Sequence, residues 1–274
     1  MSGARSAPID RVIAIDWSGA RDAAGVWLAE VVNDAVTRLE PAGSRERAVA
    51  LVAAAAREGP RLAAGFDFAF SYPAWFVAER GCADAFALWD LVARAGEGWL
   101  AAPAYPFWVL RTRAQGEVGV RAFRQTDRAM AGARVSPKSV FQLSGPGQVG
   151  TMSIRGIPLL RELRAAGLAV WPFEDPGAAQ SVAVEIYPRR YYGDAVVKGD
   201  ADARRAYLDD ARARITDAQR AACVRNDHAF DAVTAALAMW NGRAGLATLP
   251  SARDAVERVE GRIWAPEVPP RAAR

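Results

Sequence analysis

One run of the sequence, residues 226–240 (NDHAFDAVTAALAMW), places two aspartates and the chain's only histidine at the start of an almost wholly apolar helix. After Asp231 the run continues with alanine, valine, leucine and methionine, interrupted only by Thr234. A helix that is apolar on every side is normally buried. Because a buried carboxylate is costly unless it is paired, Asp231 must meet a partner inside the fold.

Short apolar runs that alternate with helical patterns predict an α/β fold. Residues 11–19, 24–32 and 35–41 predict three strands in a meander, joined at a turn-prone Asn-Asp pair, and residues 61–70 predict a fourth. The later runs LAVWPF, SVAVEIYP and GRIWAP predict short strands, and the second of them carries Glu185. Helices are predicted at 44–58, with Ser44 as N-cap, and at 83–95, 120–133, 157–167, 200–214, 217–224 and 227–240.

The order of these elements is that of an RNase H-like fold. Three meandering strands, a helix, a fourth strand, more helices, a fifth strand and a closing helix would give a mixed five-stranded sheet flanked by helices. Crossover helices make the later strands parallel. Residues 96–156 would form a large insertion between the fourth and fifth strands. Because no repeat, linker or composition break divides residues 1–274, we expect a single domain.

Carboxylates stand at the ends of these elements. Asp16 ends the first strand, Asp67 ends the fourth, and Asp231 lies in the closing helix. In such a sheet the first and fourth strands lie side by side, about 4.8 Å apart, and their carboxyl ends mark the switch point where open sheets bind ligands. Asp227 is four residues before Asp231 and faces the same way, while Glu185 ends the fifth strand, one strand further out.

Clustered carboxylates repel one another unless cations lie between them. One histidine and two distant cysteines, Cys82 and Cys223, exclude the usual zinc sites, so the expected metal is Mg²⁺ or Mn²⁺ held by oxygen ligands. Two such ions about 3.5–4 Å apart could activate a water and steady the leaving oxygen of a phosphodiester. His228, between Asp227 and Asp231, is a candidate general base.

The segments AIDWSGA, GFDFAFSYP, SVFQLSGPGQVGTMSIRGIPLLRELR, VEIYPR and NDHAFDAVTAALA carry a resemblance over most of the chain. They resemble the uncharacterised domain-of-unknown-function family 429, described as predicted RNase H-like nucleases. The last segment is also similar to the final acidic motif of RuvC-type resolvases, in which a histidine and aspartates near the helix start face the metals. The resemblance implies metal-ligand roles for Asp16, Asp67, Asp227 and Asp231. Glu185 departs from the resolvase pattern and belongs to the VEIYPR motif instead.

Each of these residues also has a purely structural interpretation. Asp16 could cap the turn that follows it, and Asp227 could cap its helix and complement the helix dipole. Glu185 could pair with Arg189 or a neighbouring arginine at the sheet edge. His228 could be a capping or core histidine.

Hydroxyl and cationic side chains supply candidate substrate contacts at Ser18, Arg124, Lys138 and Arg189. Arg124 could instead form only a surface pair with Asp127, three residues along its helix. The net charge of +4 and the isoelectric point near 9.4 suit a phosphate-rich partner, but an alanine- and arginine-rich coding bias is the better explanation of both.

Two features of the insertion are candidate contacts for nucleic acid, and each also has a simpler interpretation. The run QLSGPGQVGT could hold phosphate through backbone N–H groups, but it lacks the ending of a Walker motif. Tyr105, Phe107 and Trp108 could stack bases, with core packing as the simpler explanation.

Three functions fit the sequence to different degrees. The first is a metal-dependent nuclease or other phosphoester hydrolase, and the second is a non-catalytic RNase H-like scaffold that binds nucleic acid or a protein. The third, an actin-like ATPase, is suggested by IDWSG but lacks the duplicated domain and phosphate-gripping hairpin of that class.

Nucleic acid is a candidate partner. We expect a cytoplasmic protein without a membrane span, because no apolar run reaches about 18 residues and the first residues lack a signal-peptide layout. A dimer is an alternative to a monomer.

Overall fold

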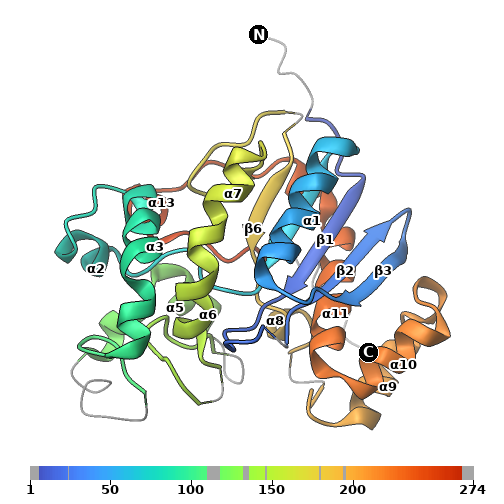
Figure 1. Cartoon of the computed structure of the whole chain (residues 1–274). Helices are drawn as coiled ribbons and strands as arrows, with labels where there is room; N and C mark the ends of the chain where they lie inside the picture. Colours follow the sequence, from blue (N-terminus) through green and yellow to red (C-terminus); the bar gives the residue numbers. More distant parts are fainter. Residues whose placement is uncertain are drawn as a thin grey trace.

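The computed structural model describes residues 6–23, 25–109, 118–131, 136–145, 147–178, 180–193 and 196–266. They form a mixed sheet with helices on both faces, in the strand order β3-β2-β1-β4-β6-β5 (Figure 1). The predicted α/β class is confirmed. The predicted number of five strands is wrong, because β5 (Ala169–Val170) pairs in parallel with β6 (Val182–Glu185) and adds a sixth, edge strand.

The first three strands form the expected meander. β1 (Arg11–Asp16) pairs antiparallel with β2 (Trp27–Val32), which pairs antiparallel with β3 (Ala35–Pro41). Asn33 and Asp34 make the turn between β2 and β3 with φ values of 49° and 67°. Asn and Asp tolerate this left-handed backbone better than other non-glycine residues, which explains why the turn forms there.

The remaining long strands run parallel to β1. β4 (Leu62–Phe66) lies beside β1 with Phe66 opposite Ile15, as predicted, and β6 lies beside β4 with Glu185 opposite Phe66. The carboxyl ends of β1, β4 and β6 therefore meet at one edge of the sheet.

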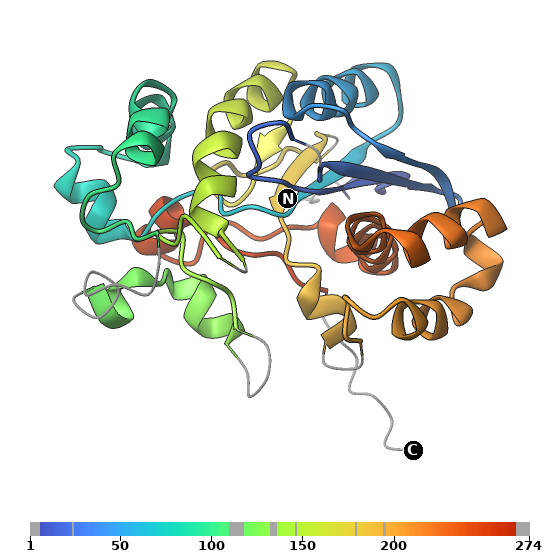
Figure 2. The ribbon, with the colours of Figure 1, turned by 60° about the horizontal axis from the view of Figure 1, so that its bottom comes forward.

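Successive side chains of β1 point to opposite faces of the sheet, and each face has its own hydrophobic cluster. Ile13 and Ile15 face the cluster that contains the buried side of α1 (Arg45–Glu58), whereas Val12 and Ala14 face the cluster built on α11 (Asp227–Asn241). This is the period of two expected for a strand covered on both faces. Figure 2 shows α1 and α7 on one face of the sheet and α11 on the other. The closing helix thus packs directly across the strands that carry the site.

The N-terminus of α1 agrees with the sequence. The Ser44 side chain accepts a hydrogen bond from the backbone N–H of Arg47, so the predicted N-cap is confirmed.

Most other helices lie in the long connection between β4 and β5 or after β6. Their bounds are α2 (Ala74–Glu79), α3 (Ala85–Ala101), η1 (Gly119–Ala122), α5 (Gln125–Met130), α6 (Val149–Gly156), η2 (Ile157–Leu159), α7 (Leu160–Ala165), α8 (Arg189–Tyr192), α9 (Ala201–Asp209), η4 (Arg212–Arg214), α10 (Asp217–Arg225), α12 (Arg243–Ala247) and α13 (Ala255–Glu260).

Several predicted elements differ in extent. The helix predicted at 120–133 is broken at Phe123 and Arg124, which have extended backbone between η1 and α5, and its last two residues lie outside the described ranges. α6 begins inside the run QLSGPGQVGT, in a part of the chain where no helix was predicted. The tail strand predicted from GRIWAP is reduced to one bridge between Ile263 and Glu185. Within the described residues, no helix is long and apolar enough to cross a bilayer.

Candidate active site

Asp16 and Asp67 are brought together by the pairing of β1 with β4. Asp16 is the last residue of β1 and is buried, and Asp67 directly follows β4 and is half-buried. The backbone N–H of Asp67 donates to the carbonyl of Ile15 at 3.1 Å, which continues the parallel ladder by one residue. The two carboxylates therefore stand side by side at the carboxyl edge of the sheet, as the sequence predicts.

Asp231 reaches the same edge from α11. The helix is capped by Asn226, whose side chain accepts from the backbone N–H groups of His228 and Ala229 at 2.8 and 3.1 Å. Asn226 therefore does the capping, and Asp227 is not needed for it. Asp231, one turn further on, is only 4% exposed, in keeping with its apolar neighbours.

The three aspartates line one cleft of about 510 Å³. Its walls come from the carboxyl ends of β1 and β4, the start of α11, the loop between α5 and α6, and the segment after β6. The lining residues are Asp16, Trp17, Ser18, Gly19, Asp67, Lys138, Gly145, Gly147, Gln148, Val149, Met152, Tyr187, Arg189, Tyr192, Lys198, His228 and Asp231.

His228 is fixed in this cleft by Asp16. Its Nδ1 lies 2.7 Å from Oδ2 of Asp16, and the hydrogen bond raises the pKa of the imidazole above its ordinary value. The ring also lies against Gly25, where a Cβ would approach Nε2 of His228 to 2.9 Å. The close backbone of Gly25 and the carboxylate of Asp16 together set the position of the ring.

Lys198 is a site residue that the sequence analysis missed. Its Nζ lies 2.6 Å from Oδ2 of Asp231 and 3.6 Å from Oδ2 of Asp227. It belongs to a loop that precedes α9, where no periodic pattern marks it. The one available signal was its rarity, since Lys138 and Lys198 are the only lysines in an arginine-rich chain.

The three carboxyl groups of the cleft have raised pKa values, chiefly because they are buried. Burial raises the pKa of Asp16 to about 7, against the hydrogen bond from His228 and with the help of the negative charge of Asp231. Burial, followed by the charges of Asp16 and Asp231, raises the pKa of Asp67 well above its ordinary value. Burial also raises the pKa of Asp231, although Lys198 opposes this shift. Each carboxyl group would ionise more readily if another cation were present.

One buried oxygen in the cleft lacks a hydrogen bond from the described residues. Oδ2 of Asp231 accepts from Lys198, whereas no described residue donates to Oδ1 with hydrogen-bond geometry, although the Tyr192 hydroxyl is near enough to lower the pKa of Asp231. Buried polar atoms are rarely left unpaired without a functional reason. An unpaired carboxylate oxygen beside two further carboxylates offers the hard oxygen donors that Mg²⁺ and Mn²⁺ take. In the described part of the chain, no three His, Cys, Asp or Glu groups are already arranged around one metal position. Carboxylate oxygens are the donor type that Mg²⁺ and Mn²⁺ prefer, and metal binding would require these carboxylates to move closer together.

Glu185 does not share this cleft, contrary to our expectation. Its Oε1 and Oε2 accept from Nη2 and Nη1 of Arg124 at 2.5 and 2.8 Å, and Oε2 also accepts from the backbone N–H of Phe70 at 3.0 Å. The carboxylate that ends β6 thus points to the insertion. The partner is neither Arg189 nor Arg190, the two considered from the sequence.

Arg124, predicted as a substrate contact, is buried and does not line the cleft. It is 1% exposed, and the remaining N–H groups of its guanidinium donate to both oxygens of Asp127 at 2.9 and 3.1 Å and to the carbonyl of Glu260 at 3.2 Å. All five guanidinium donors are therefore satisfied inside the protein. The pair with Asp127, expected at the surface, is buried.

The other predicted residues lie in or beside the cleft. Ser18, Lys138 and Arg189 line it, and the Ser18 hydroxyl also accepts from the backbone N–H of Ala20 at 3.1 Å. Asp227, with 40% of its side chain exposed, lies beside Lys198 and is not part of the lining.

Comparison of the chain with protein-family models, curated proteins and solved structures finds no match. Its function is therefore inferred from the chemistry of the cleft.

Proposed function

We propose that the protein is a divalent-metal-dependent phosphodiesterase that cleaves nucleic acid. The observation that supports this proposal is the convergence of Asp16, Asp67 and Asp231 in one cleft, where Oδ1 of Asp231 is buried without a hydrogen bond from the described residues. These three would hold Mg²⁺ or Mn²⁺, with Asp227 at the entrance. When bound, such an ion would neutralise the carboxylates and stabilise charge on phosphoryl and leaving oxygens.

The other side chains of the cleft suit a phosphodiester substrate. Lys138, Arg189 and Lys198 line the cleft and bring positive charge to an anionic polymer. His228, held at Nδ1 by Asp16, is positioned to take up a proton from a water in the cleft.

We further propose that the fold is RNase H-like and that the chain is related to domain-of-unknown-function family 429. The order β3-β2-β1-β4-β6, with an antiparallel meander followed by parallel strands, supports this proposal. So does the placement of acidic residues at the ends of β1 and β4 and in the closing helix.

The test is cleavage of labelled single-stranded, duplex, hybrid and branched nucleic acids with Mn²⁺ or Mg²⁺. The native protein is compared with D67N, which removes one carboxylate of the cleft, and with D10N. Asp10 is exposed and precedes β1 at the opposite edge of the sheet, so D10N is a matched change outside the cleft.

Metal-dependent cleavage by the native protein and by D10N, but not by D67N, is the expected result. Equal cleavage by all three would indicate a contaminating nuclease. No cleavage by any of them would leave the non-catalytic scaffold as the better account.

A further inference from the structure

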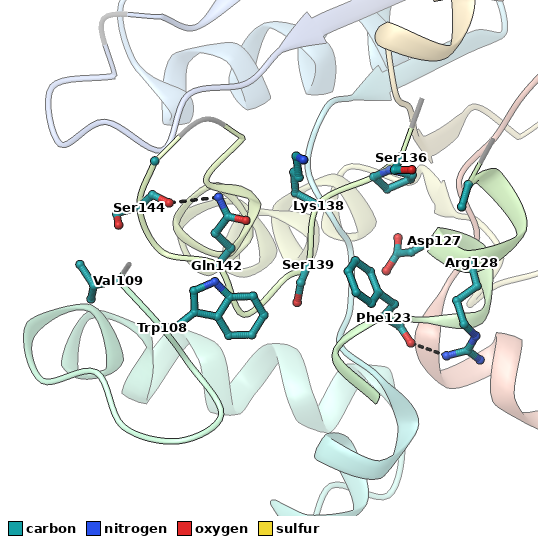
Figure 3. Close-up of a pocket in the computed structure, with 13 residues that line it drawn as sticks. Trp108, Val109, Phe123, Asp127, Arg128, Ser136, Lys138, Ser139, Gln142 and Ser144 are labelled. Carbon is teal, nitrogen blue, oxygen red and sulfur yellow. Dashed lines mark hydrogen bonds between the residues drawn. The ribbon is translucent and has the colours of Figure 1, made fainter. Parts of the chain in front are cut away.

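A second cavity of about 600 Å³ adjoins the carboxylate cleft (Figure 3). Lys138 and Gly145 belong to the walls of both cavities. The second cavity extends from this shared wall into the insertion, where Phe123, which is half-buried, and Trp108, which is 5% exposed, contribute to its lining. Its size is within the range of sites that take small organic groups.

The aromatic walls of this cavity are held in place. The backbone N–H of Trp108 donates to the carbonyl of Phe141 at 3.1 Å, and the backbone carbonyl of Trp108 accepts from the N–H of Leu143 at 2.9 Å. Phe123 is half-buried, and Figure 3 shows its ring and the Trp108 indole on either side of Ser139. The Ser139 hydroxyl is tied to the carbonyl of Ala122 at 2.7 Å, so both ring-bearing segments are joined through short hydrogen bonds.

The floor of the cavity is connected to the sheet. Asp127 lines it, and Arg124 links Asp127 to Glu185 at the end of β6. The ion pairs are almost completely buried, with 2–4% of each side chain exposed. The cavity is therefore positioned relative to the catalytic edge by a rigid contact, a condition for a substrate subsite.

Lys138 lies on the boundary between the two cavities. It is exposed and forms no ion pair with the described residues. Its stem lies over Gly147, where a Cβ would come within 2.8 Å of Cγ of Lys138. Gly147 also has φ of +70°, so only glycine allows both this turn and the path of the lysine above it.

We propose that the second cavity receives an unpaired nucleobase of the substrate while Lys138 contacts the phosphate beside it. This inference rests on the proposed nuclease function and narrows its substrate to strands that are single or locally unpaired. The half-buried ring of Phe123, with Trp108 behind it and a polar rim around it, suits the flat, polar-edged face of a base, and a stacked base within a duplex could not enter. The unpaired charge of Lys138 suits the backbone between cavity and cleft.

Binding of a labelled, cleavage-resistant phosphorothioate oligonucleotide tests the proposal. A single abasic site is moved along the strand, and affinity is measured by fluorescence anisotropy for the native protein, F123L and F86L. Phe86 is also half-buried but lines neither cavity, which makes F86L the matched control. The F123L change keeps an apolar side chain in place and removes the aromatic face.

The native protein and F86L should lose about tenfold in affinity when the abasic site falls at one position of the strand. F123L should bind the intact strand about tenfold more weakly and should no longer distinguish the abasic strand. K138Q, an exposed change, should weaken binding to intact and abasic strands equally and reduce the salt dependence.

The proposal would be overturned if F123L lost affinity equally for intact and abasic strands relative to the native protein. It would also be overturned if the abasic site changed the affinity of the native protein at no position of the strand. These outcomes are separate from failure of the proposed function. Cleavage without base-dependent binding would contradict only the proposed base-binding subsite. Base-dependent binding without cleavage would support the subsite and contradict the nuclease function.

Discussion

At the scale of single residues, the surroundings of Asp231 show why the closing helix tolerates a carboxylate. Lys198 neutralises one oxygen, and the other is buried without a hydrogen bond from the described residues, in a cleft that Asp16 and Asp67 also line. The arrangement is costly to the metal-free protein, because raised carboxyl pKa values mean that burial opposes the charged forms. Sites arranged for function commonly carry such a cost.

Removing one of these charges should therefore stabilise the protein. D67N in the absence of metal should raise the free energy of unfolding at pH 8 by on the order of 1 kcal/mol, since a folded-state pKa above the unfolded value makes the ionised group unfavourable. Thermal or urea denaturation in EDTA measures the change. D10N should leave stability unchanged, and a less stable D67N would show that Asp67 is a structural group.

Sequence patterns identified the site residues that end a predicted strand or interrupt a predicted apolar helix. Asp16 and Asp67 follow predicted strands, and Asp231 interrupts a predicted apolar helix, so their convergence was predictable. Lys198 lies in a loop with no periodic signal, and its partner is 33 residues away along the chain. The role of Glu185 was misjudged because its partner, Arg124, comes from a distant helix start whose burial depends on tertiary packing.

At the scale of elements, a buried ion-pair network is one of the contacts that attach the insertion to the sheet. Arg124 precedes α5 and joins Asp127 of that helix to Glu185 of β6, while Glu260 of α13 accepts from the backbone N–H of Gln125 at 2.5 Å. The network fixes α5 and α13 against the carboxyl edge of the sheet. The strands and the closing helix were predicted well because their alternation and apolar runs are local properties. The break at Arg124 was not, because the residue serves contacts that a local pattern does not contain.

Replacing Arg124 with lysine should weaken the attachment of the insertion to the sheet. R124K would lose the bidentate contacts of the guanidinium and leave buried carboxylates with fewer donors, so unfolding should become easier by about 3 kcal/mol. Urea denaturation measures the loss, and R128K, an exposed change nearby in α5, is its control. An R124K protein as stable as the native one would show that the network does not hold the insertion.

At the scale of the whole molecule, the carboxylate cleft should make stability depend on pH. The pKa of Asp16 is raised to about 7 by burial, and those of Asp67 and Asp231 are also raised. The folded protein thus binds protons more tightly than the unfolded chain at these groups. Their favourable contribution is fully present below about pH 4 and is lost as pH rises through about 7.

Metal should reverse this trend above pH 7, because an ion that binds only the folded state stabilises it. Melting temperatures between pH 5 and 8.5, with EDTA or with Mn²⁺, measure both effects. We expect a smaller decline toward high pH with Mn²⁺ than with EDTA, and a smaller decline in D67N than in the native protein with EDTA. Parallel curves for all of these samples would contradict the account.

The most direct test of the central claim is a Mn²⁺ titration at pH 7.5, with free ion followed by electron paramagnetic resonance. If Asp16, Asp67 and Asp231 form a metal site, the native protein and D10N will bind Mn²⁺ alike, and D67N will bind it at least about tenfold more weakly. Equal binding by D67N, or no binding by the native protein, would contradict the claim that this cleft is a metal centre.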